Sequence, residues 1–440
     1  MVDSPKGHGS QDGIGLPTCL ALVTATMVGT GVYTSLGFQL VDLQSGFSIL
    51  LLWALGGLIA LCGALSYAEL AVAIPRSGGE YTYLSELYHP ALGFMAAFTS
   101  VMAGFAAPIA LSALAFGSYL HAAFPVCPPK TASFLAVILI SLGHLRSLRL
   151  SELVQNGMTS LKFLLLVLFL LIGFWNAARH PSSLSIFLPT AHSFPELLRP
   201  SSGIALIFVL YAYSGWNAAS YLAGEVRDRQ RTVGRSLVLG TALVTVLYVV
   251  LNAIFLTAAP ASELHGVLNV GSVAATHLLG PPGGRIMSGM IGLGLLASMS
   301  AMIWAGPRVT QRVGADYRFF AKLGRVNAEG IPVWATLLQL LLVLILIATG
   351  SFESVLVYAQ VPLLLCLVLG VAGVFILRKR SAPTGFRCPF FPLPPLLFIF
   401  CTLAALLYSA LSQPWIALAG LGTMILPLLA HPWIASRNKD

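Results

Sequence analysis

Long apolar segments alternate with short polar connections along nearly the whole chain. A helix that crosses the hydrocarbon core of a bilayer needs about 20 consecutive, mostly apolar residues. Twelve segments meet or approach this length, and they span residues 16–41, 47–73, 91–121, 131–146, 152–178, 201–225, 235–259, 284–310, 332–350, 354–377, 393–411 and 414–433. The pattern predicts an all-α membrane protein with twelve transmembrane helices, folded as a single domain over residues 1–440.

The composition strengthens this prediction. Of the 440 residues, 57% are hydrophobic and 9% are charged, whereas about a quarter of the residues of a soluble domain are charged. The six cysteines are scattered and include no CxxC pair. The sequence therefore predicts neither a metal site nor a disulfide framework, and it implies no cofactor.

Basic residues lie mainly on one side of the predicted topology. An even number of spans puts both termini on one side, and if that side is the cytoplasm, nineteen Lys and Arg residues face inward and four face outward. This asymmetry follows the positive-inside rule and predicts a multi-pass protein of the cell membrane with cytoplasmic termini. It also accounts for most of the net charge of +9, so membrane lipid is the expected surrounding and no nucleic-acid partner is implied.

Two of the predicted helices contain interruptions. Gly29, Thr30 and Gly31 follow one another in the first segment, and Ser214 and Gly215 fall near the middle of the sixth. Glycine weakens a helix by about 1 kcal/mol relative to alanine, and free backbone groups inside a membrane are tolerated only against protein or a water-filled cavity. Taken alone, the first interruption is equally well explained as a helix-packing face of small residues.

The two interruptions head two sets of five segments. These sets cover residues 16–178 and 201–377, and two further helices over residues 393–433 follow them. Discontinuous helices at corresponding places in two repeats are typical of transporter substrate sites. Because each set holds an odd number of segments, the second is inverted relative to the first. The sequence thus predicts a five-plus-five inverted repeat with discontinuous helices 1 and 6.

Interrupted helices offer the two kinds of group that bind an α-amino acid. Free N–H groups at the start of a resumed helix attract a carboxylate, and free C=O groups at the end of the preceding half accept hydrogen bonds from an ammonium. Thr30 and Gly31 are the predicted donors, and glycine allows the backbone to approach the ligand closely. The predicted substrate-binding residues are Met27, Gly29, Thr30, Gly31, Tyr211, Ser214 and Gly215.

Aromatic residues flank the second interruption. Tyr211 is a candidate gate that closes over the ligand, and packing or a place in the interfacial aromatic belt is its alternative role. Tyr213 and Trp216 are interpreted as packing residues. Because this region offers no acidic or basic side chain, the pattern favours a neutral substrate.

Lys162 lies about ten residues into the fifth segment. An unpaired charge at that depth costs at least about 3 kcal/mol, and ten residues of helix rise about 15 Å, which is too deep for easy snorkelling to the interface. The lysine could carry a proton or remain a fixed cation in place of sodium, and the sequence leaves both open. Ser298 and Ser300 on the eighth segment are candidates to face Lys162, or they line a helix contact.

Two further polar residues lie near the predicted cytoplasmic side. Glu69 ends the second segment and is a candidate partner of Arg76. Asn217 follows the second interruption and is a candidate to cap or bridge the unwound backbone. An ordinary structural role explains each of them equally well.

Three motifs resemble those of a known family. Gly29-Thr30-Gly31-Val32-Tyr33 is similar to GSGIF on that family's first helix, and Tyr211-Ala212-Tyr213-Ser214-Gly215-Trp216-Asn217 is similar to FAYGGWN on its sixth. Tyr67-Ala68-Glu69-Leu70, followed by residues 74–84 (IPRSGGEYTYL), matches the family's first cytoplasmic loop closely. The chain resembles an amino acid permease of the amino acid–polyamine–organocation (APC) superfamily, similar to bacterial amino acid permeases and L-type amino acid transporters.

The resemblance implies a LeuT-like inverted-repeat fold and sodium-independent secondary transport by alternating access, as an exchanger or a proton-coupled symporter. It implies that Tyr211 stands at the family's gating aromatic and that Lys162 matches a fifth-helix lysine that replaces a sodium site. Thr30 replaces the usual serine and Tyr211 replaces Phe or Trp, so the preferred substrate side chain stays open. Cys127 falls where animal L-type light chains bond a heavy-chain glycoprotein, and a free loop cysteine is the alternative.

A channel or a non-transporting membrane scaffold is the competing interpretation. A channel more plausibly shows a ring of like charges or a repeated filter loop, and the sequence shows neither. Because no paired carboxylates, HExxH motif or Ser/His/Asp arrangement lies at membrane depth, the sequence does not predict an enzyme.

Overall fold

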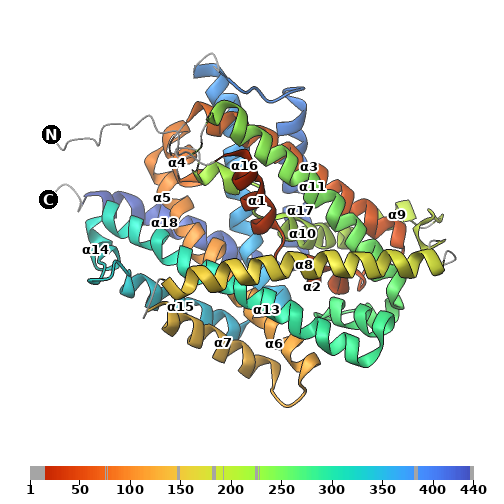
Figure 1. Ribbon diagram of the computed structural model, residues 1–440. Coiled ribbons are helices and arrows are strands. Elements are labelled where there is room, and N and C mark those ends of the chain that lie inside the picture. The colour runs from red at the N-terminus through yellow and green to blue at the C-terminus, as the bar shows by residue number, and fades with distance from the viewer. Residues whose placement is uncertain are drawn as a thin grey trace.

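The computed structural model describes residues 15–74, 76, 78–145, 149–180, 185–191, 193–222, 226, 228–380 and 385–436, without the side chains of residues 149–162, 165, 200, 222 and 229. These residues form a bundle of helices joined by short connections (Figure 1). The helices are α1 (Leu16–Met27), α2 (Gly31–Gln39), α3 (Gly46–Ala73), α4 (Gly79–Leu87), α5 (Pro90–Thr99), η1 (Ser100–Ala106), α6 (Ala107–Ala123), α7 (Pro129–His144), α8 (Arg149–Arg179), α9 (Ser193–Leu197), α10 (Pro200–Tyr213), η3 (Ala218–Leu222), α11 (Arg229–Ala258), α12 (Ala261–Leu264), α13 (Val270–Asp316), η4 (Arg318–Phe320), α14 (Ala321–Gly324), α15 (Val333–Thr349), α16 (Phe352–Arg380), α17 (Leu393–Ser412) and α18 (Pro414–Ser436).

The apolar helices lie over the segments predicted from the sequence. In the described part of the chain, eight helical stretches are long and apolar enough to cross a membrane, and four shorter apolar helices accompany them. The short ones span Pro129–His144, Leu166–Arg179, Ser201–Tyr213 and Val333–Thr349. The prediction of an all-helical, multi-pass membrane protein is therefore confirmed, whereas twelve spans and the inverted repeat stay predictions.

Two helical stretches depart from the regular helices expected. Residues 284–310 were expected to form one helix, but α13 begins earlier and bends at Gly280, whose φ of 75° is not helical and which precedes Pro281 and Pro282. The stretch Pro90–Ala123 is continuous but contains the π-helical turn η1. Such turns place a local widening inside an otherwise regular helix.

A cluster of aromatic residues joins three helices at the centre of the bundle. Trp53 on α3, Tyr213 on α10 and Tyr248 on α11 are fully buried. The Trp53 and Tyr248 rings meet edge to face with centroids 5.5 Å apart, and the Tyr213 hydroxyl donates to the Trp53 carbonyl oxygen at 3.0 Å. Tyr213 is thus a packing residue, and so is Trp216, whose ring lies against Tyr67 at 5.0 Å between centroids.

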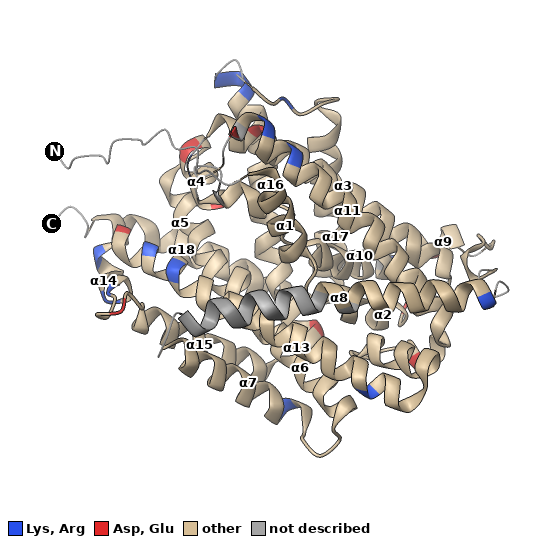
Figure 2. Cartoon of the chain, in the orientation of Figure 1, with Lys and Arg blue, Asp and Glu red and all other residues tan. Residues whose placement is uncertain are grey.

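Charged side chains lie mainly at the ends of the helices. Figure 2 shows the described Lys, Arg, Asp and Glu residues near helix termini and in connections, with the middle of the bundle largely uncharged. In Figure 1, α8 crosses the bundle, and it packs against α11 and α13. This distribution suits a chain whose apolar middle lies in lipid.

Candidate functional site at two helix breaks

The first predicted interruption is a true break in a helix. α1 ends at Met27, Val28 leaves the helical conformation with ψ 85°, and α2 begins at Gly31. Thr30 caps α2 without a side-chain hydrogen bond to its first turn. The N–H group of Tyr33 donates to the Thr30 carbonyl oxygen at 3.1 Å, whereas the N–H groups of Gly31 and Val32, at the very start of α2, have no carbonyl one helical turn before them within the helix.

The second interruption is a break as well. α10 ends at Tyr213, Ser214 turns away with ψ 142°, and the chain resumes as η3. Gly215 has a φ of 101°, and a Cβ atom there would lie 3.0 Å from the Thr26 carbonyl oxygen. Only glycine meets both requirements without strain, which explains its place in the sequence.

The two breaks lie directly against each other. A Cβ atom on Gly31 would lie 2.5 Å from Cα of Ala212, so the two backbones touch. The Thr26 hydroxyl reaches the Gly215 carbonyl oxygen at 3.2 Å. The structure thus brings together backbone from both predicted halves of the site, which are about 190 residues apart in the chain.

Tyr248 is a site residue that the sequence analysis missed. Its hydroxyl lies 2.5 Å from the Met27 carbonyl oxygen and 3.1 Å from that of Ala212, so it bridges both breaks. The available signal was a polar pair, Tyr248 and Asn252, spaced one helical turn apart in an otherwise apolar segment. The Met27 carbonyl, predicted to accept from an ammonium, already accepts from Tyr248 and keeps its second lone pair.

Thr30 and Tyr211 interact through their side chains, and each also contacts other residues. The Thr30 hydroxyl pairs with the hydroxyl of Ser112 on α6 at 2.8 Å, and both are buried. Tyr211 is 9% exposed and its ring meets that of Phe352 edge to face, with centroids 6.5 Å apart. Phe352 stacks on Phe38 at 5.6 Å, and Phe38 stacks on Phe208 at 5.0 Å. We call Phe38, Phe208, Tyr211 and Phe352 the aromatic row, which joins α2, α10 and α16.

The residues predicted around Lys162 are only partly described. The side chain of Lys162 lies outside the described residues, and its role stays a prediction. Ser298 donates to the Gly294 carbonyl oxygen of its own helix, whereas Ser300 pairs with Nε2 of His144 on α7 at 2.9 Å. Residues two apart on a helix point in different directions, so Ser298 and Ser300 do not share a face, and Ser300 faces α7.

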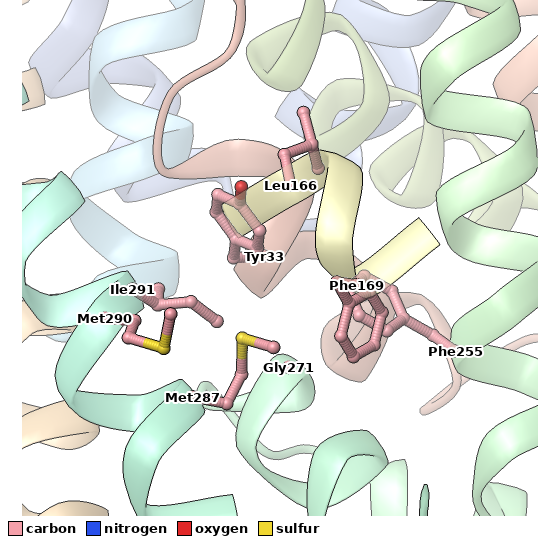
Figure 3. Close-up of a pocket in the computed structure, with 8 residues that line it drawn as sticks. All are labelled: Tyr33, Leu166, Phe169, Phe255, Gly271, Met287, Met290 and Ile291. Atoms are coloured by element: carbon pink, nitrogen blue, oxygen red, sulfur yellow. The ribbon is translucent and has the colours of Figure 1, made fainter. Parts of the chain in front are cut away.

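A small cavity lies one helical turn beyond Lys162 along α8. It is lined by Tyr33, Leu166, Phe169, Phe255, Gly271, Met287, Met290 and Ile291 and has a volume of about 20 Å³. Figure 3 shows the Tyr33 hydroxyl directed toward Leu166 at its edge. This volume holds about one water molecule, so the cavity is a packing space between helices rather than a place for an amino acid.

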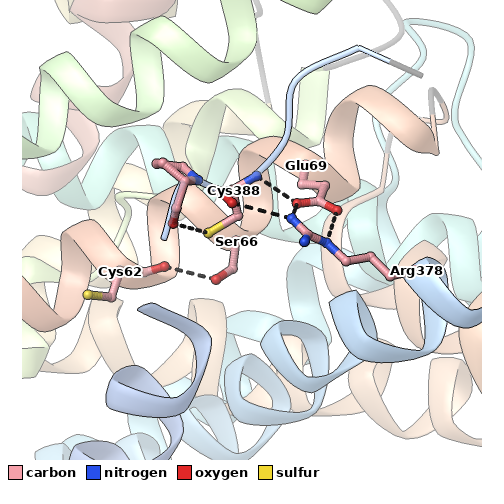
Figure 4. Close-up of polar contacts among 6 residues, drawn as sticks. Cys62, Ser66, Glu69, Arg378 and Cys388 are labelled. Atoms are coloured by element: carbon pink, nitrogen blue, oxygen red, sulfur yellow. Dashed lines mark hydrogen bonds and ion pairs between the residues drawn. The ribbon is translucent and has the colours of Figure 1, made fainter. Parts of the chain in front are cut away.

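The predicted pairing of Glu69 with Arg76 is wrong. Glu69 is fully buried, and Nε and Nη2 of Arg378 donate to its two carboxylate oxygens at 2.8 and 2.7 Å (Figure 4). The backbone N–H of Cys388 donates to the same carboxylate at 2.7 Å. Arg76 instead pairs with the exposed Glu86 at 2.9 Å. The planar guanidinium of Arg378, at the end of α16, donates two parallel hydrogen bonds to the Glu69 carboxylate. Arg76, beyond the end of α3, makes no such pair of bonds with Glu69.

The Glu69 ion pair fixes three segments together. Arg378 comes from α16, Glu69 from α3 and Cys388 from the connection to α17. The guanidinium also lies 3.8 Å from the centre of the Phe391 ring. Burial, together with the nearby Glu69 carboxylate, raises the pKa of the Cys388 thiol to about 11, so the thiol stays protonated at neutral pH.

Cys127 lies in the connection after α6. Its thiol is partly exposed, and its carbonyl oxygen lies 2.9 Å from Nδ1 of His121. The thiol faces the Pro128 carbonyl oxygen at 3.7 Å. Nothing in this geometry blocks a bond to a second chain, and the heavy-chain partner stays a prediction.

Known proteins resemble this chain along nearly its whole length. The model of the amino acid permease family matches residues 14–425. The serine/threonine exchanger SteT of Bacillus subtilis is 28% identical over 402 residues, which cover 90% of each chain. The b(0,+)-type amino acid transporter 1 of Mus musculus is 25% identical over 92% of this chain and 84% of its own length.

A human relative extends the comparison. The large neutral amino acids transporter small subunit 2 of Homo sapiens is 26% identical over 422 residues, which cover 94% of this chain and 78% of the relative. All three relatives are transporters or exchangers by name, and none is an enzyme. With the family model covering nearly the whole chain, this protein belongs to the amino acid permease family of the APC superfamily.

Proposed function

We propose that the protein is a sodium-independent secondary transporter of neutral L-amino acids that works by alternating access, as an exchanger or a proton-coupled symporter. The observation that carries this proposal is the contact between two helix breaks, with Gly31 against Ala212 and Thr26 bonded to Gly215. Paired discontinuous helices are the usual place for a small zwitterion in a transporter.

The backbone at the breaks supplies both halves of a zwitterion site. The N–H groups of Thr30 and Gly31 stand at the start of α2, where the helix dipole favours a carboxylate. The carbonyls of Met27, Tyr211 and Ser214 end the preceding halves and accept from an ammonium. Met27 and Tyr211 each already accept one bond, from Tyr248 and from the Ser214 N–H, and a carbonyl oxygen can accept two.

The side chains around the breaks favour a neutral substrate. Among those described there are the hydroxyls of Thr26, Thr30, Ser112, Ser214 and Tyr248 and the ring of Tyr211. None of these carries a charge at neutral pH, so a charged substrate side chain would lose hydration without gaining a partner among them. The names of two relatives, a serine/threonine exchanger and a large neutral amino acids transporter, point the same way.

The proposed topology has twelve spans, a LeuT-like five-plus-five inverted repeat and cytoplasmic termini. In this orientation the aromatic row lies on the outer side of the site, because α2 ends, and α10 and α16 begin, on that side. Tyr211 would then be the ring that closes over the substrate from outside. Lys162 on α8 is the proposed replacement for a sodium ion, with Ser298 on the neighbouring α13.

Counterflow in proteoliposomes tests the proposal. The purified protein is reconstituted with an unlabelled amino acid inside, and uptake of each of the twenty labelled amino acids is followed with and without sodium and a pH gradient. We expect uptake of neutral amino acids that does not depend on sodium. Uptake no greater than in protein-free vesicles for all twenty amino acids would overturn the transport proposal, and a requirement for sodium would overturn its coupling.

A separate preparation, taken from the native membrane, tests for a heavy-chain partner. Non-reducing electrophoresis of protein from its native membrane would show a larger species that disappears on reduction if Cys127 bonds a second chain. A Cys127→Ser variant is the control, because it leaves the other five cysteines in place.

A further inference from the structure

The Gly78-Gly79-Glu80 motif has no part in the proposed substrate site, yet it lies beside the second break. Gly78 and Gly79 have φ of 132° and 55°. A Cβ atom on Gly79 would lie 2.1 Å from Cε1 of Tyr221, which belongs to η3. A side chain at this position would be strained and would also collide, so glycine lets η3 lie directly against the start of α4.

Glu80 binds Asn217, which directly precedes η3, and Tyr221 within η3, with one carboxylate oxygen each. Oε1 accepts a hydrogen bond from Nδ2 of Asn217 at 2.7 Å, and Oε2 accepts one from the hydroxyl of Tyr221. Glu80 is 6% exposed and Asn217 is 8% exposed, so water contributes little to the bond between them, whereas Tyr221 is 38% exposed. Hydrogen bonds to an ionised acceptor are about twice as strong as neutral ones, and these two fasten the chain beyond the second break to α4.

The other described titratable groups around Glu80 are neutral at pH 7. Tyr67 on α3, Tyr83 on α4 and Cys366 on α16 are the titratable neighbours, apart from Tyr221. Among the described residues, no Lys, Arg or His forms an ion pair with Glu80. Within the described ranges, the contacts that the structure shows for the carboxylate are hydrogen bonds and not ion pairs, so losing them would leave a buried charge poorly solvated.

We propose that Glu80 is a positioning residue that latches the cytoplasmic side of the site: it holds η3 against α4 and releases it when the site opens inward. We call Glu80, Asn217 and Tyr221 the Glu80 latch. η3 also contacts α1, and the Thr26 hydroxyl binds Gly215 just before η3. Movement of η3 away from α4 therefore moves the inner wall of both breaks. This inference rests on the proposed alternating-access function.

Access to the site from each side of the membrane tests the latch. A Ser214→Cys probe is placed in a variant whose six native cysteines are replaced, and a membrane-impermeant maleimide is applied to right-side-out and inside-out vesicles. In Glu80→Gln, one carboxylate oxygen is replaced by an amide NH2 group. Only one side-chain oxygen then remains to accept from Asn217 and Tyr221. We expect the cytoplasmic labelling rate to rise about tenfold, and the labelling rate from outside to fall.

The reciprocal change separates a latch from a general loss of packing. A merely destabilised protein would label faster from both sides, and that outcome, like no change on either side, would overturn the proposal. Glu86→Gln is the matched control, because it makes the same substitution on the same helix at an exposed ion pair. It should leave both rates within about twofold of the parent.

A milder variant keeps the test decisive if Glu80→Gln folds poorly. Tyr221→Phe removes one donor and should shift labelling in the same direction. The double variant should shift labelling no more than the larger single variant, because residues in one hydrogen-bonded unit are not additive, and additive shifts would contradict the latch. Labelling does not require a transported substrate. If the protein fails counterflow but its labelling shifts as expected, the transport proposal is overturned and the Glu80 latch stands.

Discussion

The two ends of the candidate site are closed by different chemistry. At one end, the aromatic row joins α2, α10 and α16 through ring contacts between 5.0 and 6.5 Å, without a charged group in the row. At the other end, carboxylates join the helices: Glu80 binds Asn217 and Tyr221, and Glu69 binds Arg378 and Cys388. In the proposed orientation the aromatic end faces outward and the carboxylate end faces the cytoplasm.

This difference predicts how each end responds to change. Ring contacts contribute about 0.5–1.5 kcal/mol per pair beyond burial, and rings can shift without leaving a polar group unsatisfied. A carboxylate contact is directional, and removing one partner of a buried ion pair costs about 3–5 kcal/mol. We therefore expect a single substitution at the carboxylate end to have a large effect, and a single substitution at the aromatic end to have a small one.

The largest expected effect is at Glu69. Glu69→Gln leaves the Arg378 guanidinium, whose side chain is 23% exposed, without its counterion. Because this exposure moderates the cost, we expect the free energy of unfolding to fall by about 3 kcal/mol, and thermal unfolding in detergent should show a melting temperature lower by several degrees.

Glu86→Gln is the control for Glu69. Its ion pair with Arg76 is exposed, with side chains 77% and 36% accessible, and such pairs contribute about 0–1 kcal/mol. Equal, small shifts for the two variants would show that burial does not distinguish these pairs, and the contrast between the two ends would lose its energetic basis.

Gly31, between the two ends, is expected to give the next largest effect. Gly31→Ala adds a methyl group 2.5 Å from Cα of Ala212, a backbone atom that cannot rotate away. Overpacking of this kind costs about 1–3 kcal/mol, and we expect counterflow to fall below a tenth of the parent rate.

Gly143→Ala is the matched control for Gly31. A Cβ atom on Gly143 would meet no other atom within 4 Å, and alanine favours a helix by about 1 kcal/mol. Equal activity in the two variants would show that the backbone contact between the breaks is not required for transport.

The sequence predicted the local features of the site and missed its long-range contacts. The breaks at Gly31 and Gly215 could be predicted because glycine next to β-branched or small residues weakens a helix wherever it stands. The partner of Glu69 could not, because Arg378 lies more than 300 residues away and periodicity carries no information on which helices become neighbours. Arg76, close in sequence, was therefore the wrong choice.

Tyr248 and the bend in α13 were missed for related reasons. A single tyrosine in an apolar segment has the same pattern whether it packs in the core or binds a carbonyl on another helix. Residues 260–283 lay between two predicted helices, yet the helical turns on either side of Gly280 continue as one bent element.

Tyr248 gives the third prediction, at the junction of both breaks. Tyr248→Phe removes the hydroxyl that reaches the Met27 and Ala212 carbonyl oxygens and leaves a buried acceptor without its donor. Such a loss costs about 1–3 kcal/mol, and we expect counterflow to fall about tenfold while the protein still reaches the membrane.

Tyr213→Phe is the control for Tyr248. It removes a buried hydroxyl that binds Trp53, away from the proposed ligand groups. We expect a similar loss of thermal stability with at most a small change in the substrate concentration for half-maximal transport. If both variants alter transport alike, Tyr248 acts through packing and not through the breaks.

The smallest expected effect is at the aromatic row. Phe352→Leu removes the ring that touches both Phe38 and Tyr211, which weakens the row by about 1 kcal/mol and leaves space beside the proposed gate. We expect the rate for leucine relative to alanine to rise about threefold in counterflow, with little change in melting temperature.

Phe398→Leu is the control for Phe352. It makes the same substitution against Trp216 at the carboxylate end, where the rings are 5.9 Å apart, and should leave the ratio of the leucine rate to the alanine rate unchanged. A ratio that moves equally in both variants would mean that the aromatic row does not set the space above the substrate, and that the two ends differ in strength but not in what they control.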